Sequence, residues 1–378
     1  MTKKCVIAFG TRPEAIKLLS LMVALKQDHA HFSTHLCFTG QHPDLVQDIL
    51  SEFDLQIDTH LTCSNHDGQL HTLGSQLLLH FGNFLSSNSF DLLIVQGDTS
   101  TSYMTALAAF YQHIPIAHIE AGLRSGDLAA PWPEEGHRKS LASLCHSHFA
   151  ATKLAQNNLL REGIDPSMIW ITGNTVVDAL HLALDTLDKA PHLIDHLYTE
   201  LSHSGLPNIE QTPFLLVTCH RRENWGKNLD SLLAAIRQIL SLYPRHYIIW
   251  PLHPNPHLQT RIKHQLGGLS RVLLIPAQSY LSFVYLMRHA VLIISDSGGI
   301  QEEAPTLKTP VLLLRTNTER PECLESHLVT LVGSDTAKLV SSVKDVLESP
   351  RDFSTIVNPF GDGQAYKRLL KTLYILYD

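Results

Sequence analysis

The chain has 378 residues, of which 44% are hydrophobic and 17% charged, with a formal net charge of −7. That length predicts two domains, and the composition is that of a globular protein rather than a disordered or fibrous one. The negative charge gives no basic field for nucleic acid, and no apolar run approaches the ~20 residues of a membrane helix, so neither partner is expected.

Short apolar strands alternate with helical patterns from the N-terminus onwards. Residues 6–9 form the first expected strand, and Pro13 then opens a helix, because proline suits the first helical turn. A strand at 92–95, a helix at 102–111 and a strand at 114–119 follow further along the chain. This order predicts a parallel sheet covered by helices on both faces.

The same pattern restarts near residue 213. Strands are expected at 214–217, 247–250, 272–275, 291–294 and 311–314. The amphipathic segment 364–377 predicts a last helix that either unit could receive. The predicted fold class is therefore α/β, with two parallel-sheet domains at 1–172 and 173–363.

Cysteine and histidine usage gives no sign of a disulfide framework or a metal site. The six cysteines are scattered, most lie in apolar runs, and none forms a CxxC pair. We therefore expect reduced, mainly buried thiols of a cytoplasmic protein. The 24 histidines include no HExxH or similarly spaced pair, so no metal is predicted.

Polar residues follow several of the strands. They are Gly-Thr-Arg at 10–12, Gly-Asp at 97–98, Glu120, His-Arg-Arg at 220–222 and Ser-Gly-Gly at 297–299. Open parallel sheets bind ligands at the carboxyl ends of their strands. We therefore expect these segments to face one cleft between the two domains.

The glycine turn Ser297-Gly298-Gly299 opens a predicted helix. Free N–H groups and the helix dipole favour a phosphate there, and Glu302 and Glu303 could accept hydrogen bonds from ribose hydroxyls. The plainer interpretation is a strand–helix turn with no ligand. The segment is neither a Walker A loop nor a GxGxxG fingerprint, so neither ATP nor NAD is indicated.

The candidate cations are Arg12, Lys17 and His220. Arg12 and Lys17 flank the start of the first helix and could neutralise a diphosphate. His220 opens a dense polar cluster that could clamp phosphate or supply an acid. The alternative interpretation is solvated surface charge for Arg12 and Lys17, and a surface turn with local ion pairs for the cluster that begins at His220.

Three carboxylates, Asp98, Glu120 and Glu134, lie at predicted strand ends or in adjoining loops. Clustered or desolvated carboxyls can exchange protons near neutral pH. A salt bridge or helix cap is the alternative for each, and Asp98 in particular could cap the next helix. The stiff loop Pro-Trp-Pro before Glu134 suits the holding of a catalytic group.

Gln278 and Phe283 follow the strand at 272–275. The ring could stack on a base while the amide contacts its polar edge. A core phenylalanine on a helix is an equally good interpretation of the pattern.

Nine motifs occur in order along the chain. They are GTRPEAIK at 10–17, GDT at 97–99, HIEAGLR at 118–124, PWPEE at 131–135, TGNT at 172–175, HRREN at 220–224, HPNP at 253–256, DSGGIQEE at 296–303 and TERPE at 318–322. Together they closely resemble the non-hydrolysing bacterial UDP-N-acetylglucosamine 2-epimerases, over nearly the whole chain.

This resemblance implies a glycosyltransferase-B-like fold, with two Rossmann-like domains around a nucleotide cleft and a C-terminal helix, 364–378 here, that packs back on the N-terminal domain. It implies a homodimer that interconverts UDP-GlcNAc and UDP-ManNAc without a metal or redox cofactor. The first step would remove the C2 proton and expel UDP, giving 2-acetamidoglucal. The second would return UDP to C1 and a proton to the opposite face of C2.

Carried over position by position, the family's acid/base carboxylates correspond to Asp98, Glu120 and Glu134, and its catalytic, phosphate-facing histidine to His220. Which carboxylate serves which face of C2 stays open. The positions that would contact the UDP-sugar substrate are Arg12, Lys17, Asp98, Glu120, His220, Gln278, Phe283, Ser297, Gly298, Gly299, Glu303 and Arg320.

One segment departs from the family pattern. Many bacterial members bind a second UDP-GlcNAc as an activator, and Gln41, His42 and His253 match the positions that would serve it. Asp44, however, stands where a neutral or apolar side chain is more usual, and it would face an anion. The sequence therefore leaves allosteric activation by the substrate open.

Four other functions remain as alternatives. They are a hydrolysing epimerase that releases ManNAc and UDP, an epimerase of a modified UDP-sugar, a UDP-sugar glycosyltransferase and a non-catalytic UDP-sugar sensor. Hydrolysing relatives usually open with Gly-Ser-Arg-Ala-Glu, whereas this chain has Gly-Thr-Arg-Pro-Glu at 10–14. Three carboxylates favour proton transfer over glycosyl transfer. A sensor would be expected to have lost acid/base residues, and no acid/base position of this chain is degraded.

Overall fold

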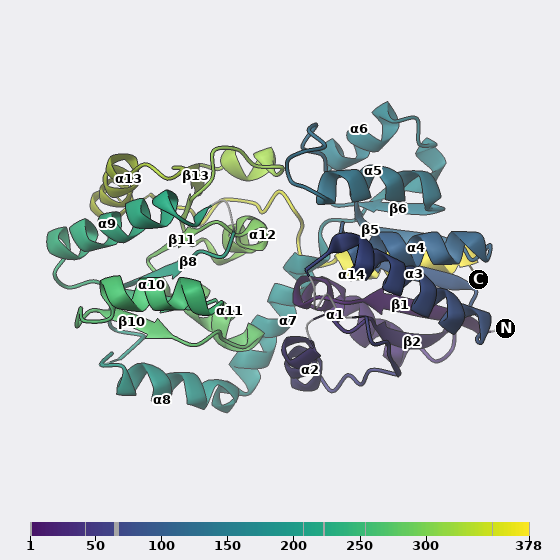
Figure 1. Ribbon diagram of the computed structural model, residues 1–378, viewed down its shortest axis with the longest axis horizontal. Coiled ribbons are helices and arrows are strands. Elements are labelled where there is room, and N and C mark those ends of the chain that lie inside the picture. Colours follow the sequence, from purple (N-terminus) through teal and green to yellow (C-terminus); the bar gives the residue numbers. More distant parts are fainter. Residues whose placement is uncertain are drawn as a thin grey trace. The chain divides into compact units, whose positions relative to one another are not determined.

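The computed structural model of the chain, shown in Figure 1, describes residues 2–41, 43–63, 68–206, 208–221, 224–253, 255–349 and 351–377. They form two compact units, Met1–Leu182 with Phe360–Asp378, and Ala183–Pro359. Helix α7 (Thr175–Lys189) begins in the first unit and ends in the second. Each unit is built on one parallel sheet, which confirms the predicted α/β class.

The sheet of unit 1 has strand order β3-β2-β1-β4-β5-β6-β7 and is parallel throughout. The order reverses between β1 and β4, and open parallel sheets commonly bind ligands at the carboxyl ends of the strands beside such a reversal. The strands are β1 (Lys3–Phe9), β2 (Phe32–Phe38), β3 (Thr59–His60), β4 (Leu92–Gln96), β5 (Ile116–Ala121), β6 (Ser147–Ala150) and β7 (Ile169–Ile171).

Helices pack against the sheet of unit 1. Apolar side chains of α3, α4 and α5, such as Phe81, Ala106 and Leu141, share one core cluster with Val6 and Val95 of the sheet. The helices of this unit other than α7 are α1 (Arg12–Gln27), α2 (Pro43–Glu52), α3 (Leu70–Ser86), α4 (Ser100–Tyr111), α5 (Glu134–Leu144), α6 (Lys153–Arg161), α14 (Ala365–Tyr377) and the 3₁₀ helix η1 (Pro166–Met168).

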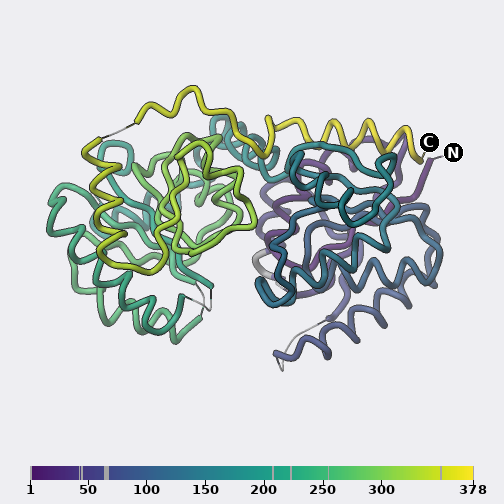
Figure 2. The backbone as a smooth tube through the Cα atoms, turned by 90° about the horizontal axis from the view of Figure 1, so that it is seen from above, coloured from purple at the N-terminus to yellow at the C-terminus, as the bar shows by residue number. Residues whose placement is uncertain are grey.

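The last helix, α14, belongs to unit 1. The Tyr374 hydroxyl donates to Asp28 Oδ2 (2.6 Å) beyond the end of α1, and the Tyr366 N–H donates to Asp178 Oδ1 (2.8 Å) on α7. Figure 2 shows this helix in yellow along unit 1, with the C-terminus close to the N-terminus. Its amphipathic pattern is thus explained by burial against helices that lie early in the sequence.

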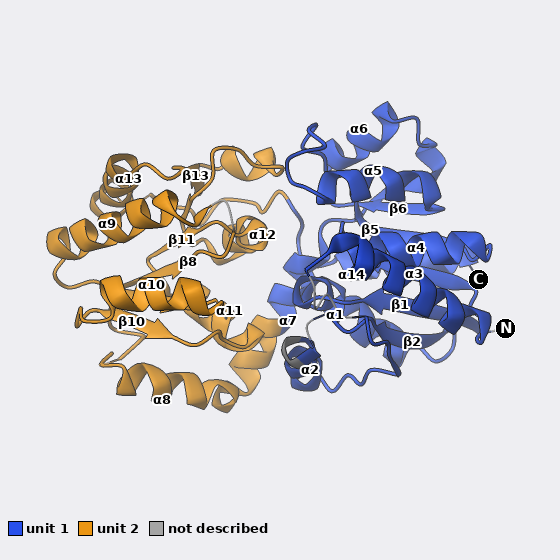
Figure 3. Ribbon diagram, in the orientation of Figure 1, with its two compact units in different colours: residues 1–182, 360–378 blue, residues 183–359 orange. Residues whose placement is uncertain are grey.

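Unit 2, orange in Figure 3, has strand order β10-β9-β8-β11-β12-β13, again parallel throughout. Its order reverses between β8 and β11, and its core includes Trp250, Ile236 and Leu292. The strands are β8 (Phe214–Thr218), β9 (Tyr247–Pro251), β10 (Val272–Ile275), β11 (Leu292–Ser295), β12 (Val311–Leu313) and β13 (Val329–Leu331). The helices are α8 (Asp195–His203), α9 (Lys227–Leu242), α10 (Pro256–Leu266), α11 (Tyr280–His289), α12 (Gly298–Leu307), α13 (Thr336–Glu348), η2 (Pro191–Ile194) and η4 (Pro321–Leu324).

All six cysteines are buried and free, as expected from their apolar surroundings in the sequence. Within the described ranges, no helix is long and apolar enough to cross a membrane.

Candidate active site

A fully buried carboxylate, Glu14, joins the loops that follow β1 and β4. It lies in the first turn of α1 and accepts the N–H groups of Thr11 (2.9 Å) and Gly10 (3.1 Å). It also accepts the hydroxyls of Thr99 (2.7 Å) and Ser102 (3.1 Å), and its burial raises its pKa. The carboxyl ends of β1 and β4 are therefore held together where the strand order reverses.

Asp98, in the loop after β4, is held by helix α5. Arg138 Nε (2.8 Å) and Nη2 (2.6 Å) both reach Asp98 Oδ2, and His137 Nδ1 donates to the backbone carbonyl of Asp98 (2.8 Å). Thr99, not Asp98, caps α4, because the Thr99 side chain accepts the Ser102 N–H (3.0 Å). The capping alternative for Asp98 is thus replaced by an ion pair.

Glu120 lies inside β5, one residue beyond the predicted end of the strand, because β5 spans Ile116–Ala121 rather than 114–119. Its φ of 63° is in the left-handed region, and the pairing with β6 shifts register between Ile119 and Ala121. A bulge of this kind re-aims one side chain, and such strain recurs at functional sites.

The Glu120 side chain is almost fully buried in an ion pair. Lys17 Nζ of α1 lies 2.7 Å from one carboxylate oxygen and 2.5 Å from the other. Gln96, at the end of β4, also donates to Oε2. Lys17 is therefore not a solvated surface charge; it neutralises a buried carboxylate at the carboxyl edge of the sheet.

Glu134 is the first residue of α5 and is half-buried. Its Oε2 is buried and accepts no hydrogen bond from any residue that the structure describes. The next residue, Glu135, is fully buried and accepts the N–H groups of Ser125 (3.0 Å) and Gly126 (3.2 Å), and a bond from Arg138 Nη1 (3.2 Å). Glu134 therefore differs from Asp98 and Glu120 in its surroundings.

Arg12, the first residue of α1, is half-buried.

In unit 2, the buried carboxylate Asp296 organises the loop after β8. It accepts the N–H groups of His220 (3.0 Å) and Arg221 (2.9 Å) and the side-chain amide of Asn224 (2.9 Å). His220 Nδ1 lies 3.0 Å from Asp296 Oδ1, while 42% of the His220 side chain is exposed. The second ring nitrogen, Nε2, is therefore the one available to a ligand.

The glycine turn after β11 opens α12, as predicted. Ser297 is the N-cap, and its side chain caps no N–H of the described first turn. A Cβ on Gly298 would lie 3.1 Å from Arg320 Nη1, so the missing side chain lets the guanidinium approach the helix start. Free N–H groups and an arginine at one helix N-terminus suit an anion.

Two buried carboxylates hold Arg320. Its Nε donates to Glu302 Oε1 (2.6 Å) and its Nη1 to Glu319 Oε1, while Arg315 Nη2 reaches Glu319 Oε2 (2.7 Å). Burial alone would raise the pKa of Glu319, but the charges of Arg320 and Arg315 hold that pKa well below its usual range. Glu302 therefore serves Arg320 rather than facing a ribose.

The remaining predicted positions lie around α11. Glu303 is buried and its Oε1 accepts the Tyr280 hydroxyl (3.0 Å). Gln278 is buried after β10, and its amide donates to Glu200 Oε2 (3.0 Å) and to the Pro276 carbonyl (3.0 Å). Phe283 lies on α11 and is half-buried, which places it at the edge of the core rather than inside it.

Comparison with known proteins decides the family. The sequence matches the family described as UDP-N-acetylglucosamine 2-epimerase over residues 24–374. The chain belongs to this family. It is 41% identical to the UDP-N-acetylglucosamine 2-epimerase of Salmonella typhimurium, with 98% of each chain covered.

Solved structures of family members have the same fold. The UDP-GlcNAc 2-epimerase of Neisseria meningitidis, bound to UDP-GlcNAc, has a TM-score of 0.91 and 38% identity, over 98% of this chain and 100% of that one. The Methanocaldococcus jannaschii enzyme, in complex with UDP-GlcNAc and UDP, has a TM-score of 0.86 and 33% identity, over 98% and 99%. The resemblance drawn from the motifs and the predicted fold are both confirmed.

The positions matched to the epimerase activator site are described only in part. Gln41 donates to Thr101 Oγ1 in unit 1. In unit 2, His253 Nδ1 accepts the Asn255 N–H (3.2 Å). His42 lies outside the described residues, as does the side chain of Asp44.

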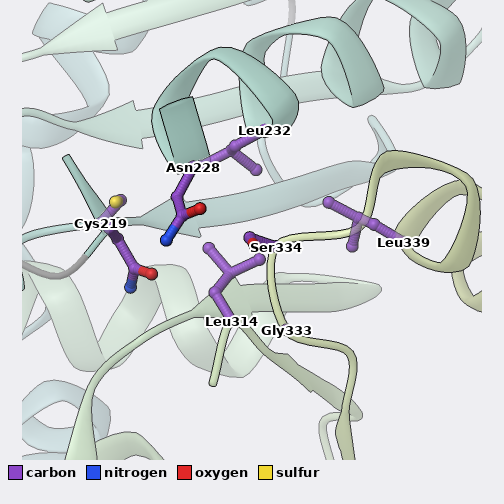
Figure 4. Close-up of a pocket in the computed structure, with 8 residues that line it drawn as sticks. Cys219, Asn228, Leu232, Leu314, Gly333, Ser334 and Leu339 are labelled. Atoms are coloured by element: carbon purple, nitrogen blue, oxygen red, sulfur yellow. The ribbon is translucent and has the colours of Figure 1, made fainter. Parts of the chain in front are cut away.

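A small pocket in unit 2 adjoins the loop that follows β8, which contains Cys219 and Asn224 (Figure 4). It is lined by Cys219, Asn224, Asn228, Leu232, Leu314, Gly333, Ser334 and Leu339. None of these side chains is charged, and burial raises the pKa of the Cys219 thiol well above its usual range. The pocket is thus no phosphate site, although Asn224 both lines it and binds Asp296.

Residues that hold the epimerase candidates in place were missed from the sequence. Arg138, Gln96, Asp296 and Glu319 each bond a predicted site residue. A weak signal existed for two of them, because Arg138 lies one helical turn after Glu134 and Asp296 directly precedes the glycine turn. Within the described ranges, no cluster of three or more His, Cys, Asp or Glu side chains is suited to a metal ion.

Proposed function

We propose that this chain interconverts UDP-GlcNAc and UDP-ManNAc by inverting C2 of the sugar. The observation that carries this is the set of three carboxylates in unit 1. Asp98 is bound to an arginine, Glu120 to a lysine, and Glu134 has a buried oxygen without a described partner. Different surroundings separate the proton affinities of neighbouring carboxyls. Inversion needs such a difference, because one group must accept a proton and another must donate one on the opposite face.

In the proposed first step, a carboxylate accepts the C2 proton and the C2–H electrons form the C1=C2 double bond. The C1–O bond breaks, and its electrons leave with the diphosphate oxygen of UDP. In the second step, a carboxyl group protonates C2 on the opposite face, and an oxygen of the terminal phosphate of UDP, whose oxygens have become equivalent by rotation, adds to C1. Protons and electrons balance over the two steps, so the sequence of steps uses no external oxidant.

The proposed role of unit 2 is to hold the nucleotide. The first turn of α12, with Gly298 and Gly299, and the side chains of Arg320 and His220 offer N–H groups to the diphosphate, which gains charge as the C1–O bond breaks. We assign Glu303 to the ribose hydroxyls, and Gln278 with Phe283 to the base. We assign Arg12 and Lys17 of unit 1 to the charge of the UDP-sugar. These roles rest on the motif positions and on the anion-binding geometry of the turn.

We further propose that the chain acts as a homodimer in the cytoplasm. Leu79 on α3 and the adjacent Phe110 and Tyr111 on α4 are exposed large apolar side chains, and α3 packs against α4. Such a patch favours association with another chain. Free, buried cysteines accord with a reducing compartment. Light scattering of the purified protein, with Tyr111→Glu as the variant expected to weaken association, tests the dimer.

The deciding experiment incubates the purified protein with UDP-GlcNAc alone in deuterium oxide. We expect UDP-ManNAc to form with deuterium at C2, and deuterium to enter UDP-GlcNAc as equilibrium is approached. An oxygen label at the C1–O bridge should move into non-bridging phosphate positions, because that bond breaks.

Each competing function gives a different product. Release of ManNAc with equal UDP indicates a hydrolysing epimerase, and turnover only with a second acceptor indicates a transferase. Turnover of a substituted UDP-sugar in preference to UDP-GlcNAc indicates an epimerase of that sugar. Binding without any turnover indicates a sensor. Epimerisation without deuterium gain would refute the elimination mechanism while leaving the net reaction in place.

A further inference from the structure

We propose that Arg138 is the positioning residue of Asp98, fixing both the direction and the ionised state of that carboxylate; the inference rests on the proposed function. Arg138 donates through Nε (2.8 Å) to Asp98 Oδ2, and its Nη2 lies 2.6 Å from the same oxygen. With Oδ2 held twice, the carboxylate group cannot rotate, so Oδ1 keeps one direction. Lysine cannot make this contact, because its single ammonium lacks the planar fork.

Arg138 is itself held from behind. Its Nη1 donates to Glu135 Oε2 (3.2 Å), and Glu135 is fully buried and accepts the N–H groups of Ser125 (3.0 Å) and Gly126 (3.2 Å). A continuous set of hydrogen bonds therefore runs from the loop before α5, through Glu135 and Arg138, to Asp98. The guanidinium is aligned before any substrate arrives.

The same helical turn carries another candidate acid/base group. Glu134 opens α5, and Arg138 follows it by four residues, so both side chains project from one face of the helix. His137 of this turn also donates to the Asp98 backbone carbonyl (2.8 Å). The first turn of α5 thus presents Glu134 and fixes Asp98 at once, so a shift of the helix would move both carboxylates together.

Arg138 is the cation bonded to the Asp98 carboxylate, and its Nη1 is shared with the Glu135 carboxylate (3.2 Å). His118 of β5 lies below the loop and bonds the Gly97 carbonyl (2.7 Å), but burial lowers the pKa of His118 to about 3, so it is neutral. Glu14 of α1 bonds the Thr99 hydroxyl (2.7 Å) after Asp98, and burial raises the pKa of Glu14. His137 donates to the backbone carbonyl of Asp98 rather than to its carboxylate. Arg138 therefore favours the ionised form of Asp98.

The test compares Arg138→Met and Arg138→Lys with a matched control. In the pair of Arg124 with Glu162, Nε and Nη2 also reach the carboxylate at 2.8 and 2.6 Å. The side-chain exposures are 8% and 30%, against 6% and 26% for Arg138 and Asp98. Arg124→Met thus removes an arginine–carboxylate pair of similar distances and burial, in the same unit, that does not touch Asp98, although Arg124 reaches both oxygens of its partner and Arg138 only one.

The readout is the pH dependence of kcat for epimerisation, together with the affinity for UDP. A neighbouring cation lowers a carboxyl pKa by roughly 1–3 units, so Arg138→Met should move the acid limb of kcat upwards by about that amount. Arg138→Lys keeps the charge and should keep the limb, but its kcat should fall by roughly 10²-fold because the carboxylate is misplaced. UDP affinity should be unchanged in both, and Arg124→Met should leave the limb in place.

The inference is overturned if Arg138→Met folds and turns over with the wild-type acid limb, or if Arg124→Met moves the limb equally. If Arg138→Met does not fold, Arg138→Gln carries the same test, because glutamine is neutral and still donates hydrogen bonds. Failure of the wild type to epimerise would instead refute the proposed function, and UDP binding, measured separately, would show whether the nucleotide site survives.

Discussion

The two units pair a buried and an exposed charged or titratable side chain in opposite ways at the carboxyl ends of their sheets. In unit 1 the group placed to react is an acid and its support is a cation: 26% of the Asp98 side chain is exposed, against 6% of Arg138. In unit 2 the relation is inverted, because 42% of the His220 side chain is exposed and none of Asp296. In both pairs the buried partner orients the exposed one.

This difference teaches how one architecture supports two kinds of chemistry. Both sheets are parallel, and in both the strand order reverses once, between β1 and β4 or between β8 and β11. A buried cation behind an exposed carboxylate favours proton transfer, whereas a buried carboxylate behind an exposed histidine orients the imidazole ring towards a ligand. The sign of the buried charge therefore separates the proposed acid/base half from the proposed nucleotide half.

The largest expected effect is on turnover, from neutral replacements of the unit 1 carboxylates. Asp98→Asn, Glu120→Gln and Glu134→Gln should each lower kcat by roughly 10²–10⁴-fold, the usual loss when a general acid or base is removed. UDP affinity should change far less. Steady-state kinetics and calorimetry with UDP measure the two quantities separately.

Glu162→Gln is the control for this series. It also removes one carboxylate charge from an ion pair of unit 1, with Arg124. Its kcat should stay near that of the wild type. Near wild-type turnover in all three carboxylate variants would contradict the proposal that unit 1 supplies the acid/base groups and unit 2 the nucleotide site.

An intermediate effect is expected on nucleotide affinity, from variants of unit 2. Arg320→Ala and Glu303→Ala each remove a charged hydrogen-bonding group, worth about 1.5–3 kcal/mol, so UDP should bind roughly 10- to 100-fold more weakly. Arg288→Ala removes the exposed pair with Asp188 elsewhere in the unit and should leave UDP affinity unchanged. Calorimetry that found wild-type affinity in both test variants would place the nucleotide elsewhere.

The smallest effect concerns stability, and it should appear in unit 1. Burial lowers the pKa of His118 on β5 to about 3, below the ordinary value near 6.5. The unfolded chain therefore binds a proton at His118 more tightly than the folded chain does. The contribution of neutral, buried His118 to the free energy of unfolding is complete above pH 6.5, and it is lost as the pH falls towards 3. At pH 5 the loss is on the order of 2 kcal/mol.

His118→Gln cannot take up that proton. Its Tm should be lower than that of the wild type at pH 7.5, because the bond to the Gly97 carbonyl is disturbed. Between pH 7.5 and pH 5, however, its Tm should fall by a few degrees less than the wild-type Tm does. Thermal scans at the two pH values measure this, and equal falls in both proteins would contradict the assignment.

The sequence alone determined the repeating elements and the residues at the edges of the sheets. Apolar strands and amphipathic helices are read from side-chain periodicity, which is local, and glycine and proline mark where each element begins and ends. Most strands accordingly begin and end within one or two residues of the predicted bounds, and β10 (Val272–Ile275) has the predicted bounds. The candidate loops were found for the same reason, because they directly follow those strands.

Only the tertiary structure decided which charges serve which groups. Arg138 and Asp98 are 40 residues apart, Asp296 and His220 are 76 apart, and Lys17 and Glu120 are 103 apart. These pairs form because β4 lies beside β1 and β5, and β11 beside β8, and strand order is not encoded in any local pattern. The bulge that places Glu120 inside β5 is likewise a matter of register with β6. A local pattern can place a carboxylate at a strand end, but the free energy of its charge depends on neighbours that only the folded chain supplies.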